Sequence, residues 1–303
     1  MVESKSFDYS QVRDVLKKLG AEEGKVVTRF PPEPSGFLHI GHIKASMLNY
    51  HYAKMYKGKM ILRFDDTNPL AEKMEFVENI QADLKTLEII PDKVSFSSDF
   101  FDQIIGYTRQ LIQAGHVYAD DTPADVMKEQ RDAGIESKHR ENTVAQNMQH
   151  FEDMLAGKTS EYCIRAKLNM QNEVKCLRDP VFFRCKDTPH HRTGTKYKAY
   201  PTYDLTCPIV DSLEGVTHAL RTIEYRDRNP LYAWVQKVLN LRKVAIYDFS
   251  KLSYKNTVMS KRKLKWFVDE GHVEGWNDPR FPTVQGIMRR GLTVDCLKEF
   301  MLE

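Results

Sequence analysis

Two strand-and-helix units near the start of this 303-residue chain constrain its fold more than any other feature. An apolar strand is predicted over residues 26–30, a proline- and glycine-rich turn over 31–36 ends it, and a helix is predicted over 38–52. A second buried strand over 60–64 and a helix over 74–87 repeat this order. Strand, helix, strand and helix in succession predict an α/β fold with a parallel sheet and right-handed crossovers.

The carboxyl ends of these two strands carry charged side chains. Arg29 lies near the end of the first predicted strand, and Asp65 directly follows the second. Ligands of open α/β sheets bind outside the carboxyl ends of the strands. Both residues are therefore candidates for a ligand-binding site.

A pair of histidines, His39 and His42, follows the first turn. They lie three residues apart at the predicted start of a helix, so they share one face. Free N–H groups and the positive end of the helix dipole attract phosphates there, and Gly41 leaves room for a flat base. Much later, residues 259–262 (Met-Ser-Lys-Arg) place a hydroxyl and two cations on a loop before another helix. Taken alone, either segment could be a structural histidine pair or a basic surface turn; together they predict two halves of a triphosphate clamp.

The regular order of strands and helices breaks between residues 95 and 198. Predicted helices and short strands mix there, over residues 100–114, 126–131, 144–155, 162–167 and 181–185. We expect an insertion with a small core of its own. After it, strands over 219–223 and 244–247 and a helix over 229–239 would complete the first sheet.

The composition is that of a chain with a substantial core, with 41% hydrophobic and 29% charged residues. A net charge of +3 is too small to indicate nucleic-acid binding, so such binding must rest on local basic clusters at 261–265 and 289–290. No segment approaches the about 20 apolar residues of a membrane span. The polar start of the chain is unlike a secretory or mitochondrial presequence. We therefore expect a cytoplasmic protein with no membrane partner.

The five cysteines are scattered and form no C-x-x-C pair, which favours reduced thiols. Cys176, Cys185, His190 and His191 are near enough in sequence to raise the question of a zinc site, which needs four converging ligands. We expect buried thiols and surface histidines there instead of a metal.

Several long motifs extend the histidine pair and the Met-Ser-Lys segment. They lie at residues 28–36, 62–69, 200–204, 215–225 and 276–283. With them, the chain resembles the class I aminoacyl-tRNA synthetases, and within these the glutamyl/glutaminyl branch, from about residue 25 to about residue 300. The resemblance implies a Rossmann-like parallel sheet, an inserted α+β domain that binds the tRNA acceptor end, and a C-terminal helical stem-contact region.

The same resemblance implies a two-step reaction. The α-carboxylate of glutamate attacks the α-phosphorus of ATP to give glutamyl-adenylate and pyrophosphate, with Mg²⁺ bridging the leaving phosphates. The acyl group then moves to the 3′-terminal adenosine of tRNA(Glu). His39, His42 and Lys261 would be catalytic, because they can stabilise charge on the phosphates. The ATP-binding residues implied are Glu33, Pro34, Ser35, His39, Gly41, His42, Lys44, Thr222, Lys251, Leu252, Met259, Ser260 and Lys261.

The resemblance places L-glutamate against Arg29, Asp65, Tyr203 and Arg221. Asp65 would accept from the α-ammonium, whereas Tyr203 and Arg29 would reach the side-chain end. Arg221 favours glutamate over glutamine, because it lies in an otherwise apolar strand and a buried guanidinium is costly without an anion. Glutaminyl enzymes carry a small uncharged residue at this position. Ile246, where a polar residue would suit an amide, points the same way.

Three alternatives to a glutamate–tRNA ligase stay open. A glutaminyl-tRNA synthetase shares most motifs, but Arg221 argues against it. A shortened paralogue that glutamylates a modified tRNA base fits the length, but the motifs follow the eukaryotic and archaeal pattern. A non-catalytic synthetase-like scaffold would not need the intact histidine pair and Lys261.

The predicted domains follow these motifs. We expect an N-terminal helical extension over 1–24, two halves of the catalytic domain over 25–94 and 199–250, the insertion over 95–198, and the Met-Ser-Lys loop with the stem-contact helices over 251–303. Whole enzymes of this branch continue into anticodon-binding β-barrels, which we expect to be absent here. The resemblance also allows fusion to a prolyl-tRNA synthetase or a place in a multi-synthetase complex.

Overall fold

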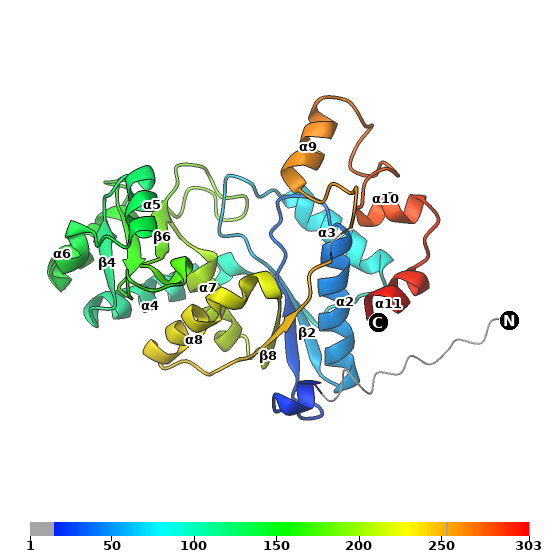
Figure 1. Ribbon diagram of the computed structural model, residues 1–303, viewed down its shortest axis with the longest axis horizontal. Helices are drawn as coiled ribbons and strands as arrows, with labels where there is room; N and C mark the ends of the chain where they lie inside the picture. The colour runs from blue at the N-terminus through cyan, green and yellow to red at the C-terminus, as the bar shows by residue number, and fades with distance from the viewer. Residues whose placement is uncertain (1–14, 253, 303) are drawn as a thin grey trace.

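The computed structural model describes residues 15–252 and 254–302. The molecule is elongated, with the inserted region at one end, the catalytic sheet in the middle and the C-terminal helices at the other end (Figure 1). Most of the N-terminal helical extension predicted over 1–24 lies outside the described residues.

A parallel sheet forms the middle of the molecule, as the sequence predicts. Strands β1 (Val27–Phe30), β2 (Lys59–Phe64) and β3 (Lys93–Phe96) pair in the order β1-β2-β3. Helices α2 (Ile40–Met55) and α3 (Met74–Thr86) are the crossovers between them. All residues of β2 after Lys59 are buried, which fits a central strand covered on both faces.

A second parallel pair of strands lies beside β1. Strands β8 (His218–Thr222) and β9 (Ala245–Phe249) pair with each other. Thr217, directly before β8, donates its N–H to the carbonyl of Val27 at 2.9 Å. The later strands therefore adjoin the first sheet, but they form a separate two-stranded ladder. The whole insertion lies in the chain between β3 and β8, yet the fold returns β8 to the side of β1.

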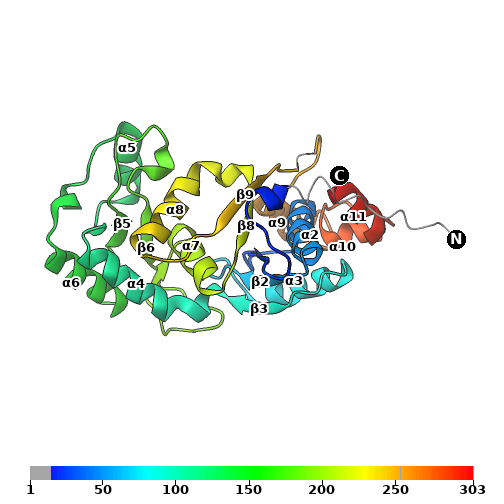
Figure 2. The same cartoon turned by 90° about the horizontal axis from the view of Figure 1, so that it is seen from below.

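The inserted region forms an antiparallel sheet in the order β4-β5-β6-β7, flanked by helices (Figure 2). Its strands are β4 (Val117–Asp120), β5 (Cys163–Ala166), β6 (Val181–Cys185) and β7 (Ala199–Pro201). Strand β7 begins directly after residue 198, where the insertion is predicted to end, so this sheet extends past the predicted boundary. Its helices are α4 (Phe101–Gln113), α5 (Ala124–Ala133) and α6 (Val144–Leu155).

The expectation that the insertion has a core of its own is wrong. Its buried side chains form one cluster with those of α7 (Tyr203–Leu213) and α8 (Asn229–Val238), which follow it in the chain. Ile209 of α7 and Val235 of α8 are fully buried in that cluster. The cause is the apolar face of these two helices, which covers the insertion's sheet. The insertion is thus packed rigidly against the catalytic part.

Three short helices end the described chain: α9 (Lys261–Asp269), α10 (Val284–Arg289) and α11 (Val294–Leu302). Leu297 and Met301 of α11 are buried in the cluster that contains Met47 of α2. This packing fixes the C-terminal helices to the helix that carries the histidine pair. Within the described residues, no helix is both long and apolar enough to span a membrane.

All five cysteines are free thiols, as expected, but Cys176 and Cys185 are half-buried, and His190 and His191 are not on the surface. The side chain of His190 is fully buried and that of His191 is 6% exposed. The Nε2 of His190 contacts the carbonyl of Asp66 at 2.8 Å, and its Nδ1 accepts from the backbone N–H of Arg192 at 3.1 Å. Backbone partners therefore explain the burial of His190. Cys176 and Cys185 lie in neither cluster of His, Cys, Asp and Glu side chains found in the described part.

Candidate active site

A cavity of about 870 Å³ opens at the carboxyl ends of β1, β2 and β8. It brings together nearly all residues that the sequence predicts for the site, from segments far apart in the chain. Those that line it are Arg29, Glu33, His39, Gly41, His42, Lys44, Asp65, Tyr203, Arg221, Thr222, Lys251, Leu252, Met259, Ser260 and Lys261. Pro34 and Ser35 do not line it. Ser35 contacts the site indirectly, through Lys261.

The histidine pair caps the N-terminus of α2. The Nδ1 of His39 accepts from the N–H of Gly41 at 3.1 Å, and the Nδ1 of His42 accepts from the N–H of His39 at 3.1 Å. Each neutral ring must then carry its proton on Nε2, which becomes a donor. The two rings lie 3.9 Å apart between centroids. The capping thus sets the tautomer that can donate to a phosphate oxygen.

Both rings are neutral at physiological pH. Burial, and then the charge of Lys261, lowers the pKa of His39 to about 4. Burial, and then His39 and Lys261, lowers the pKa of His42 well below its usual value. A neutral pair costs less to hold beside a lysine than a charged pair would. Donation from Nε2–H, without a change of charge, is the chemistry that this pair offers.

The Met-Ser-Lys segment meets the histidine segment across the cavity. The Nζ of Lys261, the first residue of α9, donates to the Oγ of Ser35 at 3.1 Å. The Ser35 hydroxyl in turn donates to Glu33 at 2.9 Å. A Cβ on Gly41 would lie 3.0 Å from the ring of His39, which would have to shift slightly, and 3.6 Å from Met259, so the two segments approach each other closely here. The predicted clamp is therefore assembled in space.

The opposite end of the cavity carries the predicted amino-acid residues. Asp65 follows β2 and is half-buried; its desolvation, followed by the charges of Asp66 and Glu33, raises its pKa to about 7. Tyr203 begins α7, and the guanidinium of Arg221 lies 5.9 Å from its ring centroid. Asp65 and Arg221 therefore bring one carboxyl group and one cation into the same cavity.

Arg221 is 5% exposed and has no acidic partner among residues 15–252 and 254–302. Its Nη1 donates to the Oδ1 of Asn229 at 3.3 Å, and its Nε has no hydrogen-bond partner. The rings of Tyr225 and Tyr232 lie 4.9 and 5.3 Å from the guanidinium. A buried charge left in this state is costly unless a ligand supplies an anion.

Arg29 forms several buried hydrogen bonds within the protein, which the sequence does not indicate. Its Nε donates to both oxygens of Asp211 at 3.0 and 3.1 Å, and its Nη1 donates to the carbonyl of Leu220 at 3.1 Å. The sequence analysis did not identify Asp211, Tyr225 or Asn229. An acid on a helix gives no sequence signal of its buried partners. Tyr225 is the last residue of the motif over 215–225, and Asn229 lies beyond that motif at the start of a predicted helix.

Comparison with known protein families decides the family. Residues 25–303 match the family described as tRNA synthetases class I (E and Q), catalytic domain. The chain belongs to this class I tRNA synthetase family. The histidine pair and the Met-Ser-Lys segment both lie within the matched residues.

Known relatives of this synthetase chain are about half identical to it. It is 54% identical over 284 residues to a probable cytoplasmic glutamate–tRNA ligase of Schizosaccharomyces pombe, covering 93% of this chain and 40% of the relative. It is 55% identical over 284 residues to a bifunctional glutamate/proline–tRNA ligase of Cricetulus griseus, covering 93% of this chain and 19% of the relative. The chain thus spans less than half the length of these relatives.

A solved structure has the same fold. A glutamate tRNA ligase from Elizabethkingia meningosepticum, crystallised with its amino acid, aligns with a TM-score of 0.58 and 21% identity. The alignment covers 80% of this chain and 53% of that one. The class I fold of the synthetase chain is therefore shared with a distant protein.

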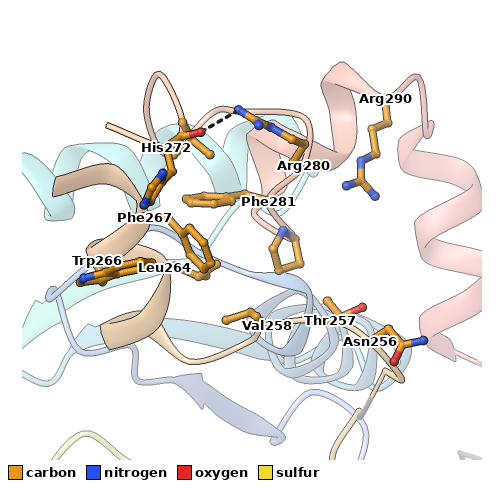
Figure 3. A pocket seen from close by; sticks show the side chains of 12 residues that line it. Asn256, Thr257, Val258, Leu264, Trp266, Phe267, His272, Arg280, Phe281 and Arg290 are labelled. Atoms are coloured by element: carbon orange, nitrogen blue, oxygen red, sulfur yellow. Dashed lines mark hydrogen bonds between the residues drawn. The ribbon is translucent and has the colours of Figure 1, made fainter. Parts of the chain in front are cut away.

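A second cavity, of about 660 Å³, lies on the far side of the Met-Ser-Lys loop (Figure 3). Val258 of that loop forms one wall, and Phe267 and Phe281 form others. None of the residues predicted for the synthetase site lines this cavity.

Proposed function

We propose that this chain activates L-glutamate with ATP and transfers it to tRNA(Glu), as the catalytic region of a glutamate–tRNA ligase. The observation that carries the proposal is Arg221, a buried guanidinium without an acidic partner among the described residues, in the same cavity as the histidine pair and Lys261. The γ-carboxylate of glutamate would supply the missing anion in bidentate geometry. Asp65 would accept from the α-ammonium.

The chemistry requires alignment and charge stabilisation more than covalent help from the protein. An oxygen of the glutamate α-carboxylate attacks the α-phosphorus of ATP, and the bond to the bridging oxygen breaks to release pyrophosphate. His39 and His42 would donate from Nε2–H to phosphate oxygens, and Lys261 would follow the β- and γ-phosphates. Fixed donors in a partly dry cavity stabilise the charge that develops there. Thr222, Lys251 and Leu252 would lie around the ribose and adenine.

The residues at the phosphate end fit ATP better than they fit a free metal ion. His39, His42 and Lys261 act as donors there, and Glu33 is a carboxylate that lines the same cavity. Mg²⁺ binds oxygen ligands and keeps several waters, so phosphate and water oxygens would supply most of its coordination. When bound, Mg²⁺ neutralises charge on the leaving phosphates.

The proposal extends to partners and location. The insertion, proposed over residues 95–198, would bind the tRNA acceptor end, and the helices from about residue 251 would contact the stem. Relatives named as cytoplasmic ligases support a cytoplasmic enzyme. The bifunctional relatives support a prolyl-specific fusion partner.

Glutaminyl-tRNA synthetase is the second candidate, because the family model covers both specificities. ATP–pyrophosphate exchange distinguishes a glutamate–tRNA ligase from a glutaminyl-tRNA synthetase. The exchange is measured once with and once without tRNA(Glu), and we expect it to depend on glutamate. Exchange driven by glutamine at lower concentrations than by glutamate would contradict the proposal. No exchange with either amino acid in either arm would favour a non-catalytic scaffold.

A further inference from the structure

A fully buried carboxylate lies behind the proposed glutamate site. Asp211, on α7, accepts from the Nε of Arg29 at 3.0 Å and from the hydroxyl of Tyr232 at 2.7 Å. It also forms an ion pair with Arg63 of β2. One carboxylate therefore ties together β1, β2, α7 and α8 at the floor of the cavity, without lining the cavity itself.

These bonds fix the orientation of Arg29. A guanidinium has five N–H groups in a rigid fork. The Nε group is held by Asp211, one Nη1 group by the carbonyl of Leu220, and one Nη2 group by the Sγ of Cys207 at 3.7 Å. Arg29 lines the cavity although its side chain is only 1% exposed, so these contacts hold it at the cavity wall. The bond to Leu220 also ties Arg29 to the residue directly before Arg221.

A second cation, Arg221, lines the same cavity as Arg29. Two positive charges in one cavity repel each other. Burial alone would raise the pKa of Asp211, but Arg29 and Arg63 outweigh it and hold that pKa well below its usual range. Asp211 is therefore an anion, and its attraction keeps Arg29 at the cavity wall in spite of the repulsion from Arg221.

We propose that Asp211 is a positioning residue for glutamate. It fixes the guanidinium of Arg29 at the wall of the cavity that Arg221 also lines, so the cationic site is formed before the substrate arrives. Interactions formed before binding add affinity because no ordering cost remains. This inference rests on the proposed function and adds a residue that never touches the substrate.

The chain offers a matched control just past the C-terminus of α7. The side chain of Glu214 is also buried; it accepts from the Nη1 of Arg63 at 3.0 Å and forms an ion pair with Lys93 at 2.9 Å. No contact between Glu214 and Arg29 is present in the described residues. A general loss of packing at this end of α7 would follow from changing either acid, whereas a loss of Arg29 orientation would follow from changing Asp211 alone.

The test compares Asp211→Asn, Tyr232→Phe and Glu214→Gln with the unchanged chain in glutamate-dependent ATP–pyrophosphate exchange. Asp211→Asn should raise the KM for glutamate about 10- to 100-fold, the range expected when a charge-assisted hydrogen bond is lost. The kcat and the KM for ATP should change much less. Tyr232→Phe keeps the ring and the charge, so it should fold and should raise the glutamate KM by a smaller factor. Glu214→Gln should lower the melting temperature and leave the glutamate KM within about twofold.

Several outcomes overturn the inference. A folded Asp211→Asn or Tyr232→Phe with an unchanged glutamate KM would do so, and Tyr232→Phe decides alone if Asp211→Asn does not fold. Equal increases in the KM for glutamate and ATP, or an equal effect of Glu214→Gln, would reduce Asp211 to a structural role. Failure of the unchanged chain to activate glutamate would instead contradict the proposed function.

Discussion

Arg221 shows how one side chain can indicate the charge of a substrate. It is buried on β8, and the oxygen of an amide, in Asn229, is its only described side-chain hydrogen-bond partner. Asp248, its neighbour in register on β9, is instead bound by the amide of Asn229 at 3.2 Å. The amide thus separates the arginine from the nearby acid. The guanidinium therefore stays charged and available.

Replacing this arginine should change amino-acid preference. We expect Arg221→Cys to raise the glutamate KM by about 100-fold, because removing one partner of a buried ion pair is strongly destabilising. Discrimination against glutamine should fall in the same variant. Arg221→Lys should show a smaller loss, because the planar fork is gone but the charge remains. Exchange kinetics with both amino acids measure this, and an unchanged glutamate-to-glutamine ratio in Arg221→Cys would place the determinant elsewhere.

Asp65 should make glutamate binding depend on pH. Burial, followed by Asp66 and Glu33, raises its pKa to about 7 in the empty protein. Below that pH the side chain is a neutral acid, which cannot pair with the α-ammonium of glutamate. We therefore expect kcat/KM for glutamate to rise with pH through about 7 and then to level off, whereas kcat, which reports the bound state, varies less. Asp65→Asn should lower kcat/KM and abolish its rise with pH near 7. If that rise persists in Asp65→Asn, another group causes it.

The start of α9 and the start of α2 form the phosphate end together, so a change in one cation should act on the chemical step. Lys261→Ala should slow adenylate formation by about 10²- to 10³-fold, the cost typical of losing one donor to a charged transition state. Lys263→Ala is the matched control, because Lys263 is exposed on the same helix and does not line the cavity. Pre-steady-state pyrophosphate release distinguishes them. A normal rate with only a raised KM in Lys261→Ala would exclude this role.

The helices and strands near the site were largely predictable because their signals are local. The periodicity of residues 74–87 and the turn before His39 gave a helix at Met74–Thr86 and a helix that begins at Ile40. Contacts between residues that are far apart in the sequence were not predictable. Nothing local says that Asp211 of α7 holds two arginines from β1 and β2, or that a two-histidine segment of the insertion is buried. Such pairings arise only when separate strands and helices pack together.

At the scale of the whole chain, the cavity is lined by segments that are far apart in the sequence. In the described residues, β1, β2, β3, β8 and β9 belong to the catalytic region, and β4 to β7 belong to the insertion. The insertion shares its core with α7 and α8, which carry Tyr203, Asp211 and Tyr232. The insertion therefore packs directly against the two helices that carry residues of the proposed glutamate site.

The assignment of the described strands predicts how the 303-residue chain would recognise tRNA by itself. Every described strand is used in the catalytic region or the insertion, so the described part contains no β-barrel that could read an anticodon. Contacts from the insertion and the basic start of α9 would be made with phosphates, which carry no sequence information. We expect the chain to charge an acceptor-stem minihelix about as efficiently as full-length tRNA(Glu), with an efficiency that falls steeply as salt increases.

Aminoacylation of three RNAs checks this expectation: the full transcript, the same transcript with a changed anticodon, and the minihelix. A minihelix with its acceptor base pairs exchanged serves as the control for recognition of the stem itself. The polypeptide is the same in every arm, so differences in its folding cannot produce a false result. Because the phosphate contacts are shared by all these RNAs, their salt dependence should be alike. A large penalty for the changed anticodon would show that an anticodon-reading surface lies within these 303 residues.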